Sequence, residues 1–323
     1  MDEKTTALCE NFIANRDIIK KVFRGENIFI YPIASNALTS HGVIADVAKL
    51  KECKKIINKY DGALSYPKGN VMIPFACVLS MKEDPKAHFD KVTRFYSFTK
   101  KHFNRSEYSA LLAIMLADYV EEDNIERVVK RGSDIYSIIK EQHSFLTNDK
   151  DSILSGLVAL SEKGNTELID DMEKCYDLLK IKYSHKSSIH SVSHVLALTK
   201  GTAHEKVDHF NELYDTLKES GKKFGVYSEL STLASVSILD EDFGKLRDTV
   251  LEIDAFLSKQ KGYGLLGLDK KTRLMHAAML TTDLYDTAHN AVTDTSDAAA
   301  VAMAAAQQIA ICVLMTGSAA ANT

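Results

Sequence analysis

Apolar positions in this sequence recur at offsets of three and four residues, in a column that repeats along most of the chain. Between Ser187 and Gly225 they indicate a short apolar helix, a polar turn and a longer amphipathic helix. An offset of three or four keeps side chains on one helix face. The column of the longer helix comprises Val207, Phe210, Leu213, Tyr214 and Leu217.

Four other columns have the same form. One begins 38 residues before Val207, two more lie further upstream, and one lies about 40 residues after it. Their members are Phe89, Val92, Phe95, Tyr96 and Thr99; Val129, Gly132, Ile135, Tyr136 and Ile139; Ile169, Met172, Cys175, Tyr176 and Leu179; and Arg247, Val250, Ile253, Asp254 and Leu257. A period of about 40 residues is typical of an array of helix pairs.

The remainder of the pattern favours an all-α fold. No run alternates apolar and polar residues over the length of a strand. All four prolines precede residue 86, as expected of a long helical region. We predict a right-handed α-solenoid-like array of about seven antiparallel helix pairs, beginning near residues 29, 70, 107, 152, 188, 229 and 271. Residues 5–23 form a capping helix at its start.

Several residues mark the expected helix ends. Pro32 and Pro74 suit the opening turns of short helices, whose longer partners cover about 44–60 and 86–103. Ser106, Ser187 and Ser228 are available to cap helix N-termini. A glycine inside a helix costs about 1 kcal/mol relative to alanine. We therefore expect a neighbouring helix to pack closely against Gly156.

Composition and charge narrow the class of partner. With 45% apolar and 26% charged residues, the chain has the composition of a globular protein. A formal net charge of -4 argues against a nucleic-acid partner, which requires a basic stripe. Five dispersed cysteines without a CxxC pair indicate buried, reduced thiols and a cytoplasmic protein. The acidic first residues do not resemble a secretory signal.

The C-terminal part forms a separate division of the sequence. We assign residues 1–292 to the helix-pair domain and residues 293–323 to an alanine-rich helix and tail. Ala298–Met315 approaches the length of a membrane span, but Gln307 and Gln308 lie near its centre, where polar groups are costly. A packed closing helix is favoured, a homo-oligomer contact or partner helix is possible, and a membrane anchor is not expected.

Gly262, Gly264 and Gly267 form a GxGxxG pattern before an expected helix. A dinucleotide site requires a strand before these glycines, whereas a helix is expected here. The pattern therefore predicts a turn between repeats with left-handed residues, and no cofactor is expected. Anion binding beside Lys270 and Lys271 is a weaker alternative.

His190 and His194 lie four residues apart on one helix face, at a spacing that can share a metal ion. HSVSH lacks the glutamate of the HExxH motif, and no third ligand is fixed by spacing. Since Ile189, Val192 and Val195 form the apolar side, we expect these histidines to face solvent or a groove, without a metal.

Two further acidic positions carry possible chemistry. Asp254 interrupts an apolar column, so it is either exposed or buried in an ion pair, with no requirement that Arg247 be its partner. His276 and Asp283 lie seven residues apart on the first helix of the last pair, a spacing too loose for a defined acid-base site. No hydrolase triad, nucleophile elbow or P-loop is present.

Small residues crowd the short helices, and this predicts that the short-helix layer lines the concave side of the array. Adjacent short helices then direct polar side chains towards a common groove. The predicted binding residues are His190, His194, Ser231, Ser235, Arg273 and His276.

Five stretches together resemble a known bacterial family, the domain of unknown function 4003: SEYSALLAIMLA, HSFLTNDKDSILSGLVALS, DMEKCYDLLK, SVSHVLALT and VLEIDAFLSKQKGYGLLGLDKKTRLMHAAML. The resemblance covers about residues 20–285. It implies a bacterial, cytoplasmic, all-helical protein and transfers no activity, cofactor or functional residue.

The favoured function is a cytoplasmic α-solenoid that binds a protein or peptide partner on its concave face. One alternative is an enzyme or small-ligand-binding protein with a groove lined by His, Arg and Asp residues of the short helices. The other is a membrane-associated protein acting through the alanine-rich helix.

Overall fold

The computed structural model describes residues 1–59, 71–142, 147, 149, 151–227, 229–264 and 267–285. These residues contain fourteen α-helices and a 3-10 helix, η2 (Glu122–Asn124), and no strand. The all-α prediction is confirmed for this part of the chain. The chain forms two compact units. Among the described residues, one (the N-terminal unit) begins at Asn11 and ends at Leu160, and the other (the C-terminal unit) combines Met1–Glu10 with residues 161–285.

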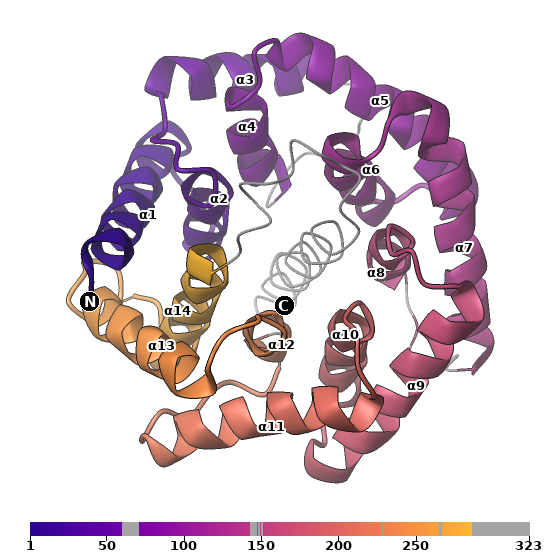
Figure 1. Ribbon diagram of the computed structural model, residues 1–323. Helices are drawn as coiled ribbons and strands as arrows, with labels where there is room; N and C mark the ends of the chain where they lie inside the picture. Colours follow the sequence, from indigo (N-terminus) through magenta and orange to yellow (C-terminus); the bar gives the residue numbers. More distant parts are fainter. Residues whose placement is uncertain are drawn as a thin grey trace. The chain divides into compact units, whose positions relative to one another are not determined.

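The N-terminal unit has two layers of helices (Figure 1). The longer helices are α3 (Val47–Lys59), α5 (Pro85–His102) and α7 (Ile125–Gln142), with most of α1 (Glu3–Val22). The shorter helices are α2 (Ile30–Thr39), α4 (Met72–Ser80), α6 (Glu107–Tyr119) and α8 (Asp151–Val158). Long helices pack on long helices (α3 on α5, α5 on α7), and short ones on short ones (α2 on α4, α6 on α8).

The C-terminal unit repeats this arrangement. Its long helices are α9 (Asn165–Lys182), α11 (Ala203–Glu219) and α13 (Phe243–Ser258), and its short-helix layer comprises α10 (Lys186–Ala197), α12 (Glu229–Ser237) and α14 (Lys270–Tyr285). In both units the most extensive packing joins a long helix to the short helix that follows it, as in α9 with α10. The packed pair is therefore long-then-short, and not the short-then-long pair that the repeat pattern indicates.

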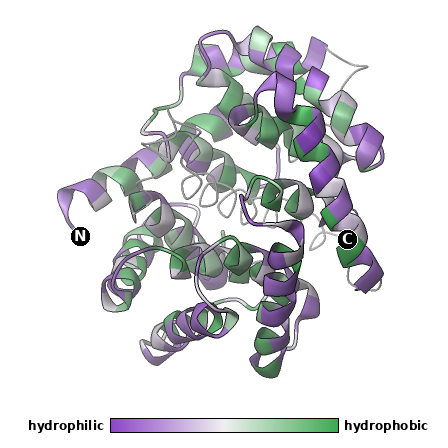
Figure 2. Ribbon diagram, turned by 45° about the vertical axis from the view of Figure 1, so that its right-hand side comes forward, coloured by the Kyte–Doolittle hydropathy of each residue, from purple (hydrophilic) through white to green (hydrophobic). Residues whose placement is uncertain are grey.

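The hydrophobic columns explain the two layers. On the long helices most column residues are buried, for example Phe210 and Leu213 on α11, and the other faces are polar. Figure 2 shows this division, with hydrophilic and hydrophobic stretches alternating along each long helix. The short helices are enclosed on all sides, because every residue from Ser109 to Ala117 of α6 is buried. The short helices thus form the core of each unit.

Helix starts follow the capping signals in part. Ser106 forms a capping box with Ser109 at the start of α6, and Pro32 and Pro74 lie in the first turns of α2 and α4. The prediction for Ser187 is wrong: α10 begins at Lys186, and its N-cap residue is His185, which makes no side-chain cap. Ser228 lies outside the described residues.

Cationic side chains bind the C-terminal carbonyls of several short helices. Such contacts satisfy carbonyl groups that have no partner within the helix and oppose the negative end of its dipole. The contacts are Lys91 Nζ to Ala117 O (2.8 Å), Arg131 Nη1 to Ala159 O (3.1 Å), Lys163 Nζ to Ala197 O (2.6 Å) and Lys4 Nζ to Leu284 O (3.1 Å). Each contact lies within one unit; Lys91, Arg131 and Lys4 donate from long helices, and Lys163 donates from the loop before α9.

Other predictions about architecture remain predictions. The α-solenoid and its right-handed sense concern how all the pairs are arranged along the chain. The boundary at 292/293 and the stretch Ala298–Met315 lie outside the described residues. Within the described ranges, no helix has both the length and the apolar character required to cross a membrane.

Candidate functional site

The six predicted binding residues all lie on short helices of the C-terminal unit: His190 and His194 on α10, Ser231 and Ser235 on α12, and Arg273 and His276 on α14. Five are buried, and the Arg273 side chain is 12% exposed. The structure therefore gathers them in one layer of one unit but encloses them within it. Their role in binding remains a prediction.

His190 and His194 are buried, so the expectation that they face solvent is wrong, whereas the alternative that they line a groove remains a prediction. Their ring centroids lie 4.6 Å apart, and His190 also meets Tyr176 edge to face. His194 Nδ1 lies 2.7 Å from the carbonyl oxygen of His190, which can only accept, so this nitrogen carries the proton. Polar residues are tolerated here because they bond within their own helix, as Ser193 does to His190 O. Among the described residues, no group of three or more potential ligands could hold a metal ion.

Two polar contacts connect the other predicted residues to their surroundings. Ser235 Oγ lies 3.2 Å from Thr282 Oγ1, which joins α12 to α14. The Tyr263 hydroxyl lies 2.9 Å from His276 Nδ1, so the loop before α14 is fixed to that helix. The first contact stabilises the packing of α12 on α14, and the second fixes the loop before α14 to that helix.

Asp254 is the centre of a buried ion cluster. Its carboxylate is 1% exposed and accepts from Arg273 Nε at 2.7 Å and from Lys222 Nζ at 2.6 Å. Arg247 instead pairs with Asp248. Since a buried carboxylate is stable only when paired, this confirms the ion-pair interpretation of Asp254. The cluster ties α13 to α14 and to the loop that follows α11.

The glycines of the GxGxxG pattern form a closed turn between α13 and α14. Gly262 and Gly264 have positive φ angles (98° and 112°), as predicted for left-handed turn residues. Leu268 N donates to Gly262 O and Gly264 N to Leu268 O, so two backbone donors of the loop are satisfied internally. A side chain at Gly267 would meet Gly262 O at 2.2 Å. These glycines therefore serve the turn itself.

A feature that the sequence analysis missed is a lysine-rich edge of the C-terminal unit. It comprises the three places where a long helix ends and the next short helix begins, in segments 178–187, 217–227 and 258–273. The basic residues are Lys180, Lys182, Lys186, Lys218, Lys222, Lys223, Lys259, Lys261, Lys270, Lys271 and Arg273. The acidic residues in these segments are Glu219 and Asp269. We call this surface the lysine edge.

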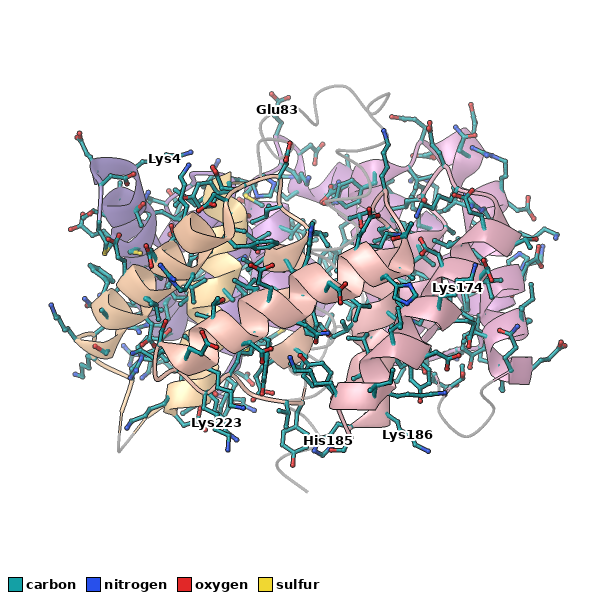
Figure 3. All side chains as sticks on the ribbon, turned by 60° about the horizontal axis from the view of Figure 1, so that its bottom comes forward. Lys4, Glu83, Lys174, His185, Lys186 and Lys223 are labelled. Atoms are coloured by element: carbon teal, nitrogen blue, oxygen red, sulfur yellow. The ribbon has the colours of Figure 1, made fainter. Side chains whose placement is uncertain are left out.

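Contacts between the three segments show that they lie side by side. Lys182 Nζ bonds Asp215 on α11 at 2.6 Å. The His185 and Tyr227 rings lie 4.3 Å apart. The Asp254 cluster then joins the second segment to the third. Figure 3 shows His185, Lys186 and Lys223 together at one side of the unit, away from Lys174 on the body of α9.

Seven lysines of this edge have no ion-pair partner among the described residues. They are Lys186, Lys218, Lys223, Lys259, Lys261, Lys270 and Lys271, and all are exposed. Lys186, Lys270 and Lys271 lie in the first turns of α10 and α14, where the helix dipole disfavours a positive charge. Fold stability alone does not explain lysines there. By contrast, the turn from α12 to α13 is acidic, with Asp240, Glu241 and Asp242 before α13.

The signal for this surface was present in the sequence. The net charge is a sum over the whole chain, so it does not reveal a local cluster of lysines. The helix-pair pattern, in contrast, brings three lysine-rich segments that are distant in sequence to one edge. The alternation of long and short helices could have identified it before the structure did.

The described residues together define a class: an all-α protein of paired helices, with a lysine-rich edge on its C-terminal unit. The chain belongs to the family described as "Protein of unknown function (DUF4003)", whose family model matches residues 17–310. The resemblance stated from the sequence is thereby confirmed.

The chain is also similar to "Uncharacterized protein YeaA" of Bacillus subtilis (strain 168). The two chains are 27% identical over 224 residues, which cover 68% of this chain and 67% of that protein. No solved structure matches the chain.

Proposed function

We propose that this protein is a helix-pair binding protein that takes an acidic protein or peptide partner on its lysine edge. The observation that carries the proposal is the group of seven exposed lysines without ion-pair partners at one edge of the C-terminal unit. A surface of one charge sign steers a partner of the opposite sign and raises its association rate.

The lysine edge fits this role better than the six predicted groove residues do. Five of those residues are buried and the Arg273 side chain is 12% exposed, so they present little surface to a partner. The same burial disfavours the enzyme alternative, which requires a groove open to substrate. The lysine edge needs no rearrangement.

A cytoplasmic location is part of the proposal. Cys9, Cys53, Cys77 and Cys175 are free and buried. Burial raises the pKa of Cys9 to about 12 and that of Cys53 to about 11, which leaves these thiols protonated and unreactive. Free thiols suit a reducing compartment.

The test measures binding of a short labelled glutamate-rich peptide by fluorescence anisotropy, with a glutamine version of the peptide as reference. One variant combines Lys186→Gln, Lys223→Gln and Lys271→Gln. An exposed charge contact is worth roughly 0.5 kcal/mol and 1.4 kcal/mol is tenfold, so we expect affinity to fall about tenfold. Its salt dependence should also weaken.

The matched control combines Lys86→Gln, Lys130→Gln and Lys174→Gln. It changes net charge equally, but each lysine pairs with an aspartate one turn away on a long helix. Affinity should stay within about twofold of the wild type, because these contacts are local. Equal weakening by both triple variants, or equal binding of the glutamine peptide, contradicts the proposal.

A further inference from the structure

The lysine edge contains two large apolar side chains that are exposed. Ile181, on the last turn of α9, is 82% exposed, and Tyr227, before α12, is 54% exposed. A single exposed apolar residue is ordinary on a protein surface. Two on the lysine edge call for a comparison with the other repeats.

That comparison shows that the fold does not require an apolar residue at Ile181. The position lies two residues after the last residue of the hydrophobic column, on the exposed side of a long helix. The four equivalent residues in the other repeats are all charged: Lys101, Glu141, Glu219 and Lys259. Ile181 thus departs from a charged pattern at a site where packing places no demand on it.

Tyr227 is held in place by a neighbouring ring. The His185 and Tyr227 centroids lie 4.3 Å apart at an interplanar angle of 55°. Ordering an aromatic side chain in advance reduces the entropy lost when a partner binds. His185 and Lys186 are adjacent in sequence, so this aromatic pair lies beside an unpaired lysine (Figure 3).

We propose that the partner of the lysine edge is an amphipathic acidic segment, with aliphatic side chains that bind at Ile181 and at Tyr227 while its carboxylates bind the exposed lysines of the edge that have no ion-pair partner. This inference rests on the proposed function and adds the partner's chemistry. Neighbouring helices lie about 8–10 Å apart, so three long helices span roughly 20 Å. An extended segment of about six residues has that length.

A single chain segment fits this strip better than an anionic bilayer. A bilayer would cover the whole breadth of the edge, including the carboxylates of Glu219 and Asp269, which repel anionic lipid. A peptide can follow the lysines between them. Charge complementarity along a narrow path therefore selects an acidic peptide segment as the occupant.

The experiment compares two labelled acidic peptides that differ only in one central residue, leucine or serine. We expect the wild-type protein to bind the leucine peptide about tenfold more tightly, the usual scale for one apolar side chain in a contact. In an Ile181→Gln and Tyr227→Ser double variant, both peptides should bind as the serine peptide binds the wild type.

The control variant is Ile138→Gln on α7, which removes a 37% exposed isoleucine from the other unit and should retain the leucine preference. Equal affinity of the two peptides for the wild type, or a preference that survives in the double variant, overturns the inference. If lysine substitution weakens both peptides but no leucine preference exists, only this inference fails. If lysine substitution has no effect, the proposed function fails as well.

Binding to vesicles of phosphatidylserine and phosphatidylcholine tests a membrane surface as the alternative partner. Lysine-dependent vesicle binding that the leucine peptide does not displace would identify a membrane surface instead and overturn the peptide partner. Displacement of the protein from vesicles by the peptide supports it. Thermal unfolding of each variant, expected to match the wild type at these exposed sites, confirms that binding changes do not reflect misfolding.

Discussion

Two glycines allow α7 and α8 to approach more closely than any other residue would permit. A Cβ atom at Gly132 would lie 2.8 Å from the Cα atom of Gly156, and one at Gly156 would lie 2.5 Å from a Leu112 methyl carbon. Such distances require the neighbour to move. The close packing expected at Gly156 is confirmed, and its partners are α7 and α6.

We predict that Gly132→Ala destabilises the protein more than Gly156→Ala. Gly132→Ala meets backbone, which cannot move without shifting a helix, whereas Gly156→Ala meets the end of a flexible side chain. Overpacking costs about 1–3 kcal/mol, which outweighs the roughly 1 kcal/mol gained in helix propensity. Urea unfolding measures the difference.

Gly244→Ala is the control for that comparison. Gly244 lies in the first turn of α13, and the nearest atom to its added Cβ would be Asp242 Oδ1 at 3.0 Å, the side-chain oxygen that caps this helix. We expect this variant to be neutral or slightly stabilised. A Gly132→Ala protein as stable as Gly244→Ala would show that the two helices can separate without cost.

At the scale of one helix, the N-terminus of α11 is fixed by a charge-assisted cap. Thr202 N donates to Glu205 Oε2 at 2.7 Å, and Glu205 N donates to Thr202 Oγ1 at 3.3 Å. The pKa of Glu205 lies below its ordinary value of 4.5. The main cause is the hydrogen bond from the Thr202 backbone N–H, and the second is the hydrogen bond from the Thr202 hydroxyl. The ionised form is therefore favoured in the folded protein.

This lowered pKa predicts a pH-dependent contribution to stability. A carboxyl whose pKa falls on folding stabilises the fold above its unfolded pKa, and the effect is lost as pH falls through the folded value. Glu205→Gln should therefore lower the free energy of unfolding at about pH 7 and have a smaller effect at about pH 3.5. Chemical denaturation at the two pH values measures this. A pH-independent effect of Glu205→Gln would contradict the prediction.

The helices also show what sequence patterns can and cannot predict. The columns gave the long helices because an offset of three or four directly reports one buried face. The columns could not predict that His190 and His194 are buried. A helix that is buried on all sides has no polar face, and its polar side chains form hydrogen bonds within the helix. The apolar residues of α10 therefore marked one buried side of a helix that is buried on every side.

Cationic contacts to short-helix C-termini illustrate a second limit. Lys91 and Arg131 occupy equivalent positions on α5 and α7, and the equivalent residue on α9 is Asp171. There the contact to Ala197 O comes instead from Lys163, which Asp171 binds at 2.8 Å. Lys206 also binds Asp171. The interaction is kept while its residues change, so a search for a repeated lysine or arginine would miss it.

At the scale of the whole molecule, one helix contributes to both compact units. Residues up to Glu10 of α1 belong to the C-terminal unit, and those from Asn11 belong to the N-terminal unit. In the first part, Lys4 donates to Leu284 O at the end of α14. In the second, Asn15 donates to Val43 O (2.8 Å) and accepts from Ala45 N (2.7 Å). A sequence pattern that shows one capping helix does not reveal this division.

We predict that substitutions in the two halves of α1 act on different units. Asn15→Ala removes the partners of buried backbone groups in the segment after α2, at about 1–3 kcal/mol for an unsatisfied group. Amide hydrogen exchange should therefore accelerate between Thr39 and Ala45, with little change in α14. Lys4→Met should instead accelerate exchange in the last turn of α14, by less, because a partly exposed hydrogen bond contributes only about 0.5–1.5 kcal/mol. Hydrogen exchange measured by mass spectrometry distinguishes the two regions. If either substitution accelerated exchange equally in both regions, α1 would act as a single rigid element and the prediction would be wrong.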